Sequence, residues 1–184
     1  MKARVNKVTI QIVQDDILSL TAGGIVNPTD TNLHVSPALA ERAGPSVQRA
    51  CAAVGWCETG YAVTTDAGSL PFEKIIHAVG PRWGEGSERG KLASVTLECL
   101  RLAEQNRLKS VAFPAISVGV LGYPAENCAK TMLSQIIDFT FEDLKYLRTV
   151  IICLDDPVVY QIFKNEFAEQ LKELKEAGDG EVKV

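Results

Sequence analysis

The chain has 184 residues, of which 46% are hydrophobic and 23% are charged, so it has the length and composition of one globular domain with a sizeable core. Its net charge is −4 and no basic stripe is visible, which argues against extended DNA or RNA as the main partner. No apolar run is long enough for a membrane helix and the first residues lack a signal-peptide pattern. We therefore expect a cytoplasmic protein with no membrane partner.

The cysteines and histidines give no sign of a metal or a cofactor. There are five cysteines, an odd number, and no CxxC pair. They stand mostly among apolar residues, so buried and reduced thiols are expected. The two histidines, His34 and His77, are too few to complete a zinc site with confidence. We predict neither a metal site nor a cofactor.

Strands and helices alternate along the first half of the chain. Residues 5–13 alternate apolar and polar side chains, which is typical of a half-buried strand. Further elements follow in this order: a short apolar strand ending at Pro28, a helical pattern over 37–54 that is interrupted at Gly44–Pro45, and two strands over 61–68 and 74–81. The glycine-rich, charged segment 82–90 is predicted to be an exposed loop.

The second half continues the same alternation. The expected elements are a helix over 91–106, a strand over 109–116, a helix over 124–139, a continuous apolar strand over 147–155, and a helix that Asp156 caps, Pro157 opens and Gly178 follows. This order predicts a layered α/β domain with a largely parallel or mixed sheet. We expect one domain over residues 1–178 and a flexible tail over 179–184.

The segment AFPAISVGVLGYP, residues 112–124, is the most informative loop. In open α/β sheets, ligands bind beyond the carboxyl ends of the strands, and this loop follows such a strand. Gly119 and Gly122 allow successive amides to converge on an anion, and Ser117 can add a hydroxyl donor. A phosphate or diphosphate would suit this loop, although an ordinary strand-to-helix connection can also contain turn glycines.

Two polar segments have both a structural and a functional interpretation. In NPTDTNLHVSP, residues 27–37, the polar side chains are explained by turn chemistry, and the functional alternative is recognition of sugar hydroxyls by Asn27 or Asp30. Asp15 and Asp16 follow the first strand and suit a helix cap, with binding of an exocyclic base amine as the alternative.

The remaining polar and aromatic residues give weaker signals. His77 lies within a predicted strand and is interpreted as a core histidine, and Trp56 and Trp83 as packing residues. Tyr123 borders the glycine loop, and its ring is expected to pack on a ribose. No nucleophile elbow, Cys/His signature or paired-carboxylate motif is present. Asp30 or Asp155 could activate a water molecule, but their spacing singles out neither.

Taken together, four segments resemble the macro domain, a module that binds ADP-ribose. They are DDI at 15–17, GGIVNPTDTNL at 23–33, GYAVTTDAGSLPFEKIIHAVGP at 60–81 and SVAFPAISVGVLGYP at 110–124. They occur in the order of the family and span nearly the whole chain, from Val5 to Leu171. The resemblance implies a three-layer α/β/α fold with a mixed, largely parallel central sheet.

The resemblance also implies roles for individual residues. Asp16 would hold the adenine amine with the Ile17 amide beside it, Asn27 would support the first loop, and residues 117–123 would enclose the diphosphate and the distal ribose. Leu154 and Asp155 would flank the adenine, with aliphatic contact in place of aromatic stacking. The full set of expected ligand-binding residues is Asp16, Ile17, Asn27, Asp30, Val35, Ser36, Ser117, Val118, Gly119, Val120, Leu121, Gly122, Tyr123, Leu154 and Asp155.

The first loop departs from the pattern of hydrolytic macro domains. Their N-A-A-N motif, glycine run and acidic residue are replaced here by NPTDTNLHVSPALAERAG, with Asp30 at the second asparagine and Val35–Ser36–Pro37 in place of the acidic segment. This loop is similar to that of the histone macro variant, whose branch binds rather than hydrolyses. Loss of backbone donors and of a carboxylate that positions water should impair catalysis more than binding.

The main hypothesis is therefore a binding module for ADP-ribose, either free or attached to a protein. The alternative is a hydrolase that removes mono-ADP-ribose from an acidic side chain or deacetylates O-acetyl-ADP-ribose, with the ligand's own phosphate positioning the water and Asp30 as a weak catalytic candidate. A third hypothesis is that the domain binds another nucleotide or RNA. The net charge of −4 argues against RNA.

Overall fold

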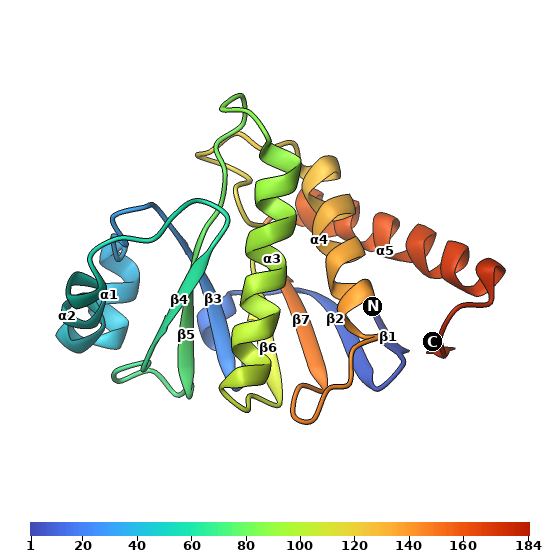
Figure 1. Ribbon diagram of the computed structural model, residues 1–184, viewed down its shortest axis with the longest axis horizontal. Helices are drawn as coiled ribbons and strands as arrows, with labels where there is room; N and C mark the ends of the chain where they lie inside the picture. Colours follow the sequence, from blue (N-terminus) through green and yellow to red (C-terminus); the bar gives the residue numbers. More distant parts are fainter.

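The structure is a computed structural model that describes residues 1–184, and it contains one eight-stranded mixed sheet between two layers of helices (Figure 1). The strands are β1 (Lys2–Val5), β2 (Val8–Gln14), β3 (Gly24–Thr29), β4 (Ala62–Thr65), β5 (Lys74–Val79), β6 (Ser110–Phe113), β7 (Thr149–Leu154) and β8 (Val182–Lys183). Their order across the sheet is β4-β5-β3-β6-β7-β2-β1-β8. The three-layer α/β/α architecture expected from the sequence is confirmed.

Five α-helices and one short 3₁₀ helix connect the strands. They are α1 (Pro37–Ala43), α2 (Pro45–Val54), α3 (Glu88–Gln105), α4 (Ala125–Phe139), α5 (Pro157–Ala177) and the 3₁₀ helix η1 (Ile17–Ser19). The predicted interruption at Gly44–Pro45 separates α1 from α2, and Asp156 caps α5 by accepting from the Val158 amide at 2.7 Å. None of the helices is long and apolar enough to cross a membrane.

Alternate side chains of the strands point to opposite faces of the sheet and build two separate cores. The larger core contains 33 buried residues and joins one face to α3, α4 and α5. The smaller core contains 14 buried residues and joins the other face to α1 and α2, which Figure 1 shows near β4 and β3. All five cysteines are unpaired and buried, as expected from their apolar neighbours.

The two ends of the chain differ from the sequence-based prediction. The predicted single strand over 5–13 is instead a hairpin of β1 and β2, because the chain turns at Asn6, which has a φ of 56°. The tail that was predicted to be flexible contains Val182 and Lys183, which form β8 and pair with β1. The Asn6 side chain connects these two regions, since its Oδ1 accepts from the Glu181 amide at 3.1 Å.

The topology brings several loops to one edge of the sheet. The strands β5, β3, β6, β7 and β2 are neighbours and all run parallel. Their carboxyl ends therefore meet at the same edge, which is where ligands bind in open α/β sheets. The segments that leave this edge are 15–16 after β2, 30–36 after β3, 80–87 after β5, 114–124 after β6 and 155–156 after β7.

Candidate functional site

Two adjoining cavities lie at this edge, and we name them by their polar residues. The acidic chamber has a volume of about 430 Å³ and is lined by Asp15, Asp16, Ile17, Pro28, Pro114, Ala115, Val118, Gly119, Cys153, Leu154, Asp155, Asp156 and Val159. The serine chamber has a volume of about 520 Å³ and is lined by Pro28, Thr29, Asp30, His34, Val35, Ser36, Pro37, Ala115, Ser117, Val118, Val120 and Leu121. Pro28, Ala115 and Val118 line both, so the two chambers form one continuous cleft.

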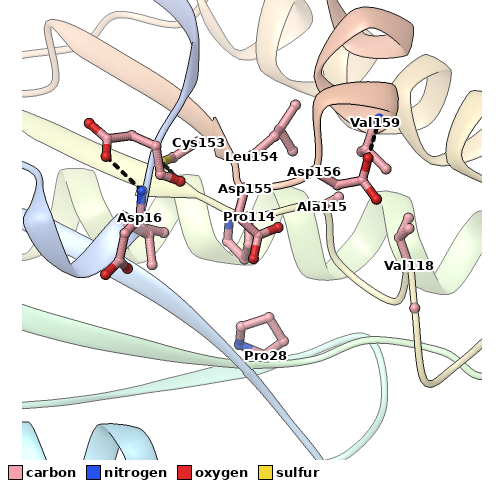
Figure 2. Close-up of a pocket in the computed structure, with 13 residues that line it drawn as sticks. Asp16, Pro28, Pro114, Ala115, Val118, Cys153, Leu154, Asp155, Asp156 and Val159 are labelled. Atoms are coloured by element: carbon pink, nitrogen blue, oxygen red, sulfur yellow. Dashed lines mark hydrogen bonds between the residues drawn. The ribbon is translucent and has the colours of Figure 1, made fainter.

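The four aspartates of the acidic chamber differ in their hydrogen bonding (Figure 2). Asp15 accepts from the Asp16 amide at 2.8 Å, and Asp16 accepts from the Leu18 amide at 3.0 Å. Asp16 therefore caps η1, as the structural interpretation of the sequence predicts, and lines the cavity as well. Asp156 caps α5, whereas the Asp155 carboxylate has no hydrogen-bond or ion-pair partner in the protein. Asp155 is thus the one of the four carboxylates in which both oxygens lack a partner in the protein.

The walls between these carboxylates are apolar. Leu154 is buried and stands at the end of β7, and Val159 lies in the first turns of α5. The Cys153 thiol donates to the Asp15 carbonyl at 3.3 Å, and burial raises the pKa of this thiol to about 11. Cys153 is therefore a protonated part of the wall at neutral pH. A flat, mostly apolar group with donor atoms at its edge would fit such a chamber.

The glycine loop presents unpaired backbone donors to the cleft. Ser117, Gly119 and Gly122 have φ values of 68°, 94° and 76°, in the left-handed region. The loop is closed by hydrogen bonds from the Gly122 amide to the Gly119 carbonyl at 2.9 Å and from the Tyr123 amide to the Ser117 carbonyl at 3.0 Å. The amides of Ser117, Gly119, Val120 and Leu121 donate to no acceptor in the protein. Successive free amides in such a turn form an anion-binding concavity.

The Ser117 side chain adds a buried donor to this loop. Ser117 is 4% exposed, and its Oγ has no hydrogen-bond partner. Buried hydroxyl groups are usually paired, so an unpaired one that lines a cavity is a group that a ligand can satisfy. The hydroxyl lies close to Gly80, where a β-carbon would come within 2.3 Å of it. Gly80 therefore makes room for Ser117.

Asp30 and His34 form a pair at the rim of the serine chamber. The Asp30 carboxylate lies 2.6 Å from His34 Nδ1 and accepts from the amides of Asn32 at 3.0 Å and His34 at 3.3 Å. Partial burial raises the pKa of Asp30, but the His34 side chain and these two amides outweigh it and lower the pKa. The turn chemistry expected for this loop is thus present. The same carboxylate also faces the cleft.

Asn27 lines neither chamber, and its side chain instead hydrogen-bonds to a buried histidine beneath the first loop. Its Nδ2 donates to His77 Nδ1 at 3.1 Å, and His77 Nε2 lies 2.9 Å from the Thr65 hydroxyl. Because that hydroxyl donates to the Asp66 carbonyl, the pattern fits a neutral imidazole protonated at Nε2. Burial lowers the pKa of His77 to about 4. The interpretation of His77 as a core histidine is confirmed.

This buried histidine predicts a dependence of stability on pH. The unfolded chain protonates His77 near its ordinary pKa of 6.5 and the folded chain near 4, so the unfolded state binds more protons between these values. The free energy of unfolding should therefore fall as the pH is lowered through this window, with about 3 kcal/mol due to His77. In urea unfolding from pH 7 to pH 4, His77→Gln should be less stable at pH 7 but lose less stability on acidification. Equal losses in both proteins would contradict this.

Tyr123 lies outside the two chambers of the cleft. Its side chain is 3% exposed and contacts Trp83 edge to face, with 5.0 Å between the ring centroids. Burial raises the pKa of its phenol. Tyr123 and Trp83 line a separate cavity of about 320 Å³ with residues of α3, α4 and α5, and Tyr123 lines neither chamber of the cleft. The ring is therefore packed against Trp83 away from both chambers, and its expected contact with a ribose stays a prediction.

The cleft also contains residues that sequence reasoning missed. Gly122 was expected in the site but lines neither chamber, whereas Pro114, Ala115, Cys153, Val159 and His34 line the cleft without having been predicted. The signal for these residues was their position, because each lies at or just after the carboxyl end of a strand, in the loop that follows, or in the first turn of the next helix. All other expected ligand-binding residues, apart from Asn27 and Tyr123, line one of the two chambers.

Comparisons with known proteins agree with this arrangement. The O-acetyl-ADP-ribose deacetylase of Salmonella typhimurium is 38% identical over 157 residues, which are 80% of this chain and 88% of that protein. The Oceanobacillus iheyensis macrodomain with ADP is 30% identical with a TM-score of 0.87, and covers 94% of this chain and 97% of its own. The Trypanosoma brucei macrodomain in complex with ADP-ribose is 27% identical with a TM-score of 0.78, over 85% and 68% of the two chains.

These relatives do not support the expected placement of the first loop in the histone macro-variant branch, because the similar curated proteins with an assigned activity carry the name of a deacetylase. The family itself is clear. A model of the macro domain matches residues 26–132, which is more than half of the chain. The chain therefore belongs to the macro domain family.

Proposed function

We propose that this protein binds ADP-ribose, free or attached to a protein, along the two chambers. The observation that carries the proposal is the row of unpaired amides at Ser117, Gly119, Val120 and Leu121 where the chambers meet. Neither chamber contains a lysine or arginine, so these amides and hydroxyls such as those of Ser117 and Ser36 are the donors available for a diphosphate. Solved relatives of this chain carry ADP and ADP-ribose in their names, which supports this ligand class.

The charges of the chambers orient the ligand. Four carboxylates in the acidic chamber would repel phosphates but accept hydrogen bonds from an adenine amine and from ribose hydroxyls. The adenosine therefore belongs in the acidic chamber, with Asp16 near the amine and Leu154 and Val159 against the ring. The second ribose then lies in the serine chamber beside Asp30 and Ser36. Because Leu154 offers aliphatic rather than aromatic contact, we expect a weaker hold on adenine than stacking provides.

Hydrolysis of O-acetyl-ADP-ribose is a second candidate, favoured by the Asp30–His34 pair and by the name of the relatives. In this step water attacks the ester carbonyl carbon while the pair takes a proton from the water. The bond between the carbonyl carbon and the ribose oxygen breaks, and that oxygen takes the proton. The products are ADP-ribose and acetate with a released proton. Removal of an ester-linked ADP-ribosyl group from an acidic side chain would use the same residues.

One paired experiment tests both candidates. By calorimetry, ADP-ribose should bind more tightly than ADP by about tenfold, because only ADP-ribose fills both chambers. The same protein is then incubated with O-acetyl-ADP-ribose, and acetate release is compared with the Asp30→Ala variant and with Asn32→Gln, an exposed control in the same loop. Release that disappears only in Asp30→Ala supports the hydrolase. Binding of ADP-ribose without release of acetate supports a binding module that is not a hydrolase. If ADP-ribose does not bind, both candidate functions are contradicted.

A further inference from the structure

The Asp155 carboxylate has an unusual position among the aspartates of the acidic chamber. Asp15, Asp16 and Asp156 each accept hydrogen bonds from nearby amides, whereas Asp155 has no partner within the protein. Figure 2 shows its side chain between those of Asp16 and Val118, in the middle of the residues that line the cavity. An unpaired carboxylate in this place can accept from a ligand, and it will repel a ligand that brings negative charge to the same point.

No cation in the cleft compensates for this charge. The acidic chamber has four aspartates and no lysine or arginine, and the one basic side chain of the serine chamber is His34, which is paired with Asp30. The free amides are concentrated at the glycine loop, where the buried Ser117 hydroxyl also lacks a partner. The glycine loop, where the two chambers meet, is therefore the part of the cleft that suits a phosphate group.

We infer that Asp155 makes this site selective for adenosine whose ribose hydroxyls are unphosphorylated. The inference rests on the proposed function, because it takes the adenosine end of ADP-ribose to lie in the acidic chamber. In dinucleotide-binding α/β folds a carboxylate accepts from the ribose 2′-hydroxyl, and sites that take a 2′-phosphate have an arginine nearby. Here Asp155 supplies a repulsive element against the phosphorylated competitor, which is a common basis of specificity.

The size of the effect follows from the charges. A 2′-phosphate carries nearly two negative charges and would lie next to Asp155, with Asp16 and Asp156 in the same chamber. Even after screening by solvent and salt, such repulsion should weaken binding by at least about 30-fold. The ratio should shrink at higher ionic strength, because the carboxylate is exposed.

The test compares ADP-ribose with 2′-phospho-ADP-ribose by calorimetry. The wild-type protein should bind ADP-ribose at least about 30-fold more tightly, and Asp155→Asn should reduce this ratio to a few-fold. The asparagine keeps an acceptor for a hydroxyl but loses the charge, so the affinity for ADP-ribose itself should fall by about a few-fold, while the affinity for the phosphorylated ligand should rise. Asp143→Asn is the matched control, because Asp143 is also exposed and unpaired but lies in the loop before the amino end of β7.

The outcomes separate this inference from the proposed function. Equal affinity of the wild-type protein for both ligands would overturn the selectivity. An unchanged ratio in Asp155→Asn, or the same change in Asp143→Asn, would overturn the assignment to Asp155. If neither ligand binds, the proposed function itself has failed. If ADP-ribose binds and the ratio collapses only in Asp155→Asn, the inference holds.

Discussion

Replacing Gly119 with glutamate should abolish the binding of ADP-ribose while the protein still folds. Gly119 has a φ of 94°, and a β-carbon at this position meets no atom within 4 Å, so the side chain extends from the loop without a clash. The backbone strain of a side chain at positive φ costs on the order of 1–2 kcal/mol, which a domain of this size tolerates. The added carboxylate, however, lies beside the amides that would hold the diphosphate.

We expect the affinity for ADP-ribose to fall by more than about 100-fold, because the substitution adds both bulk and negative charge at the anion site. The measurement is calorimetry together with thermal unfolding. Gly178→Glu is the matched control, since Gly178 also has positive φ and open space around it but ends α5 and lines neither chamber. Unchanged affinity in Gly119→Glu would place the phosphates elsewhere.

Gly80→Ala should damage both stability and binding through a single added methyl group. A β-carbon here would lie 2.3 Å from Ser117 Oγ and 2.6 Å from Ile116 Cγ2. Rotation of the serine relieves the first contact, but Ile116 is fully buried in the larger core, so the backbone at 116–117 has to shift. Such overpacking typically costs about 1–3 kcal/mol.

The same shift should displace the Ser117 hydroxyl and the free amides that follow it. We expect the affinity for ADP-ribose to fall by about tenfold or more, measured by calorimetry beside urea unfolding. Gly90→Ala is the control, because Gly90 lies in α3 with open space around it and should gain about 0.5–1 kcal/mol. Wild-type stability and affinity in Gly80→Ala would show that the methyl group is accommodated without moving the loop.

The sequence predicted the parts of the fold that depend on local pattern. The alternation of strands and helices, the break at Gly44–Pro45 and the Asp156 cap all depend on residues near in sequence, and all are present. The prediction of one strand over 5–13 missed the hairpin because it overlooked that the apolar positions change from odd numbers (Ala3, Val5) to even numbers (Val8, Ile10, Ile12) at the turn. The β8 pairing was missed because it arises from a contact with the opposite end of the chain.

The site shows the same limit. The glycines of the 112–124 segment and the strand ends around it identified the cleft, because parallel strands bring their carboxyl ends together. The sequence could not show which side of the loop Tyr123 occupies, because that depends on Trp83 and on the side chains of α4. It also could not show that Asp30 is paired with His34 or that Asp155 is free.

In the proposed mode of binding, backbone amides and the buried Ser117 hydroxyl meet the phosphates, so recognition of the anion does not depend on the outward side chains of the loop. The loop must keep its φ values at Ser117, Gly119 and Gly122, but its outward side chains are not required for that task. Val120, at the tip, is 94% exposed. A substitution at Val120 can change which groups the rim of the cleft contacts without removing a backbone donor. Related proteins could therefore prefer different groups attached to ADP-ribose and still bind its diphosphate in the same way.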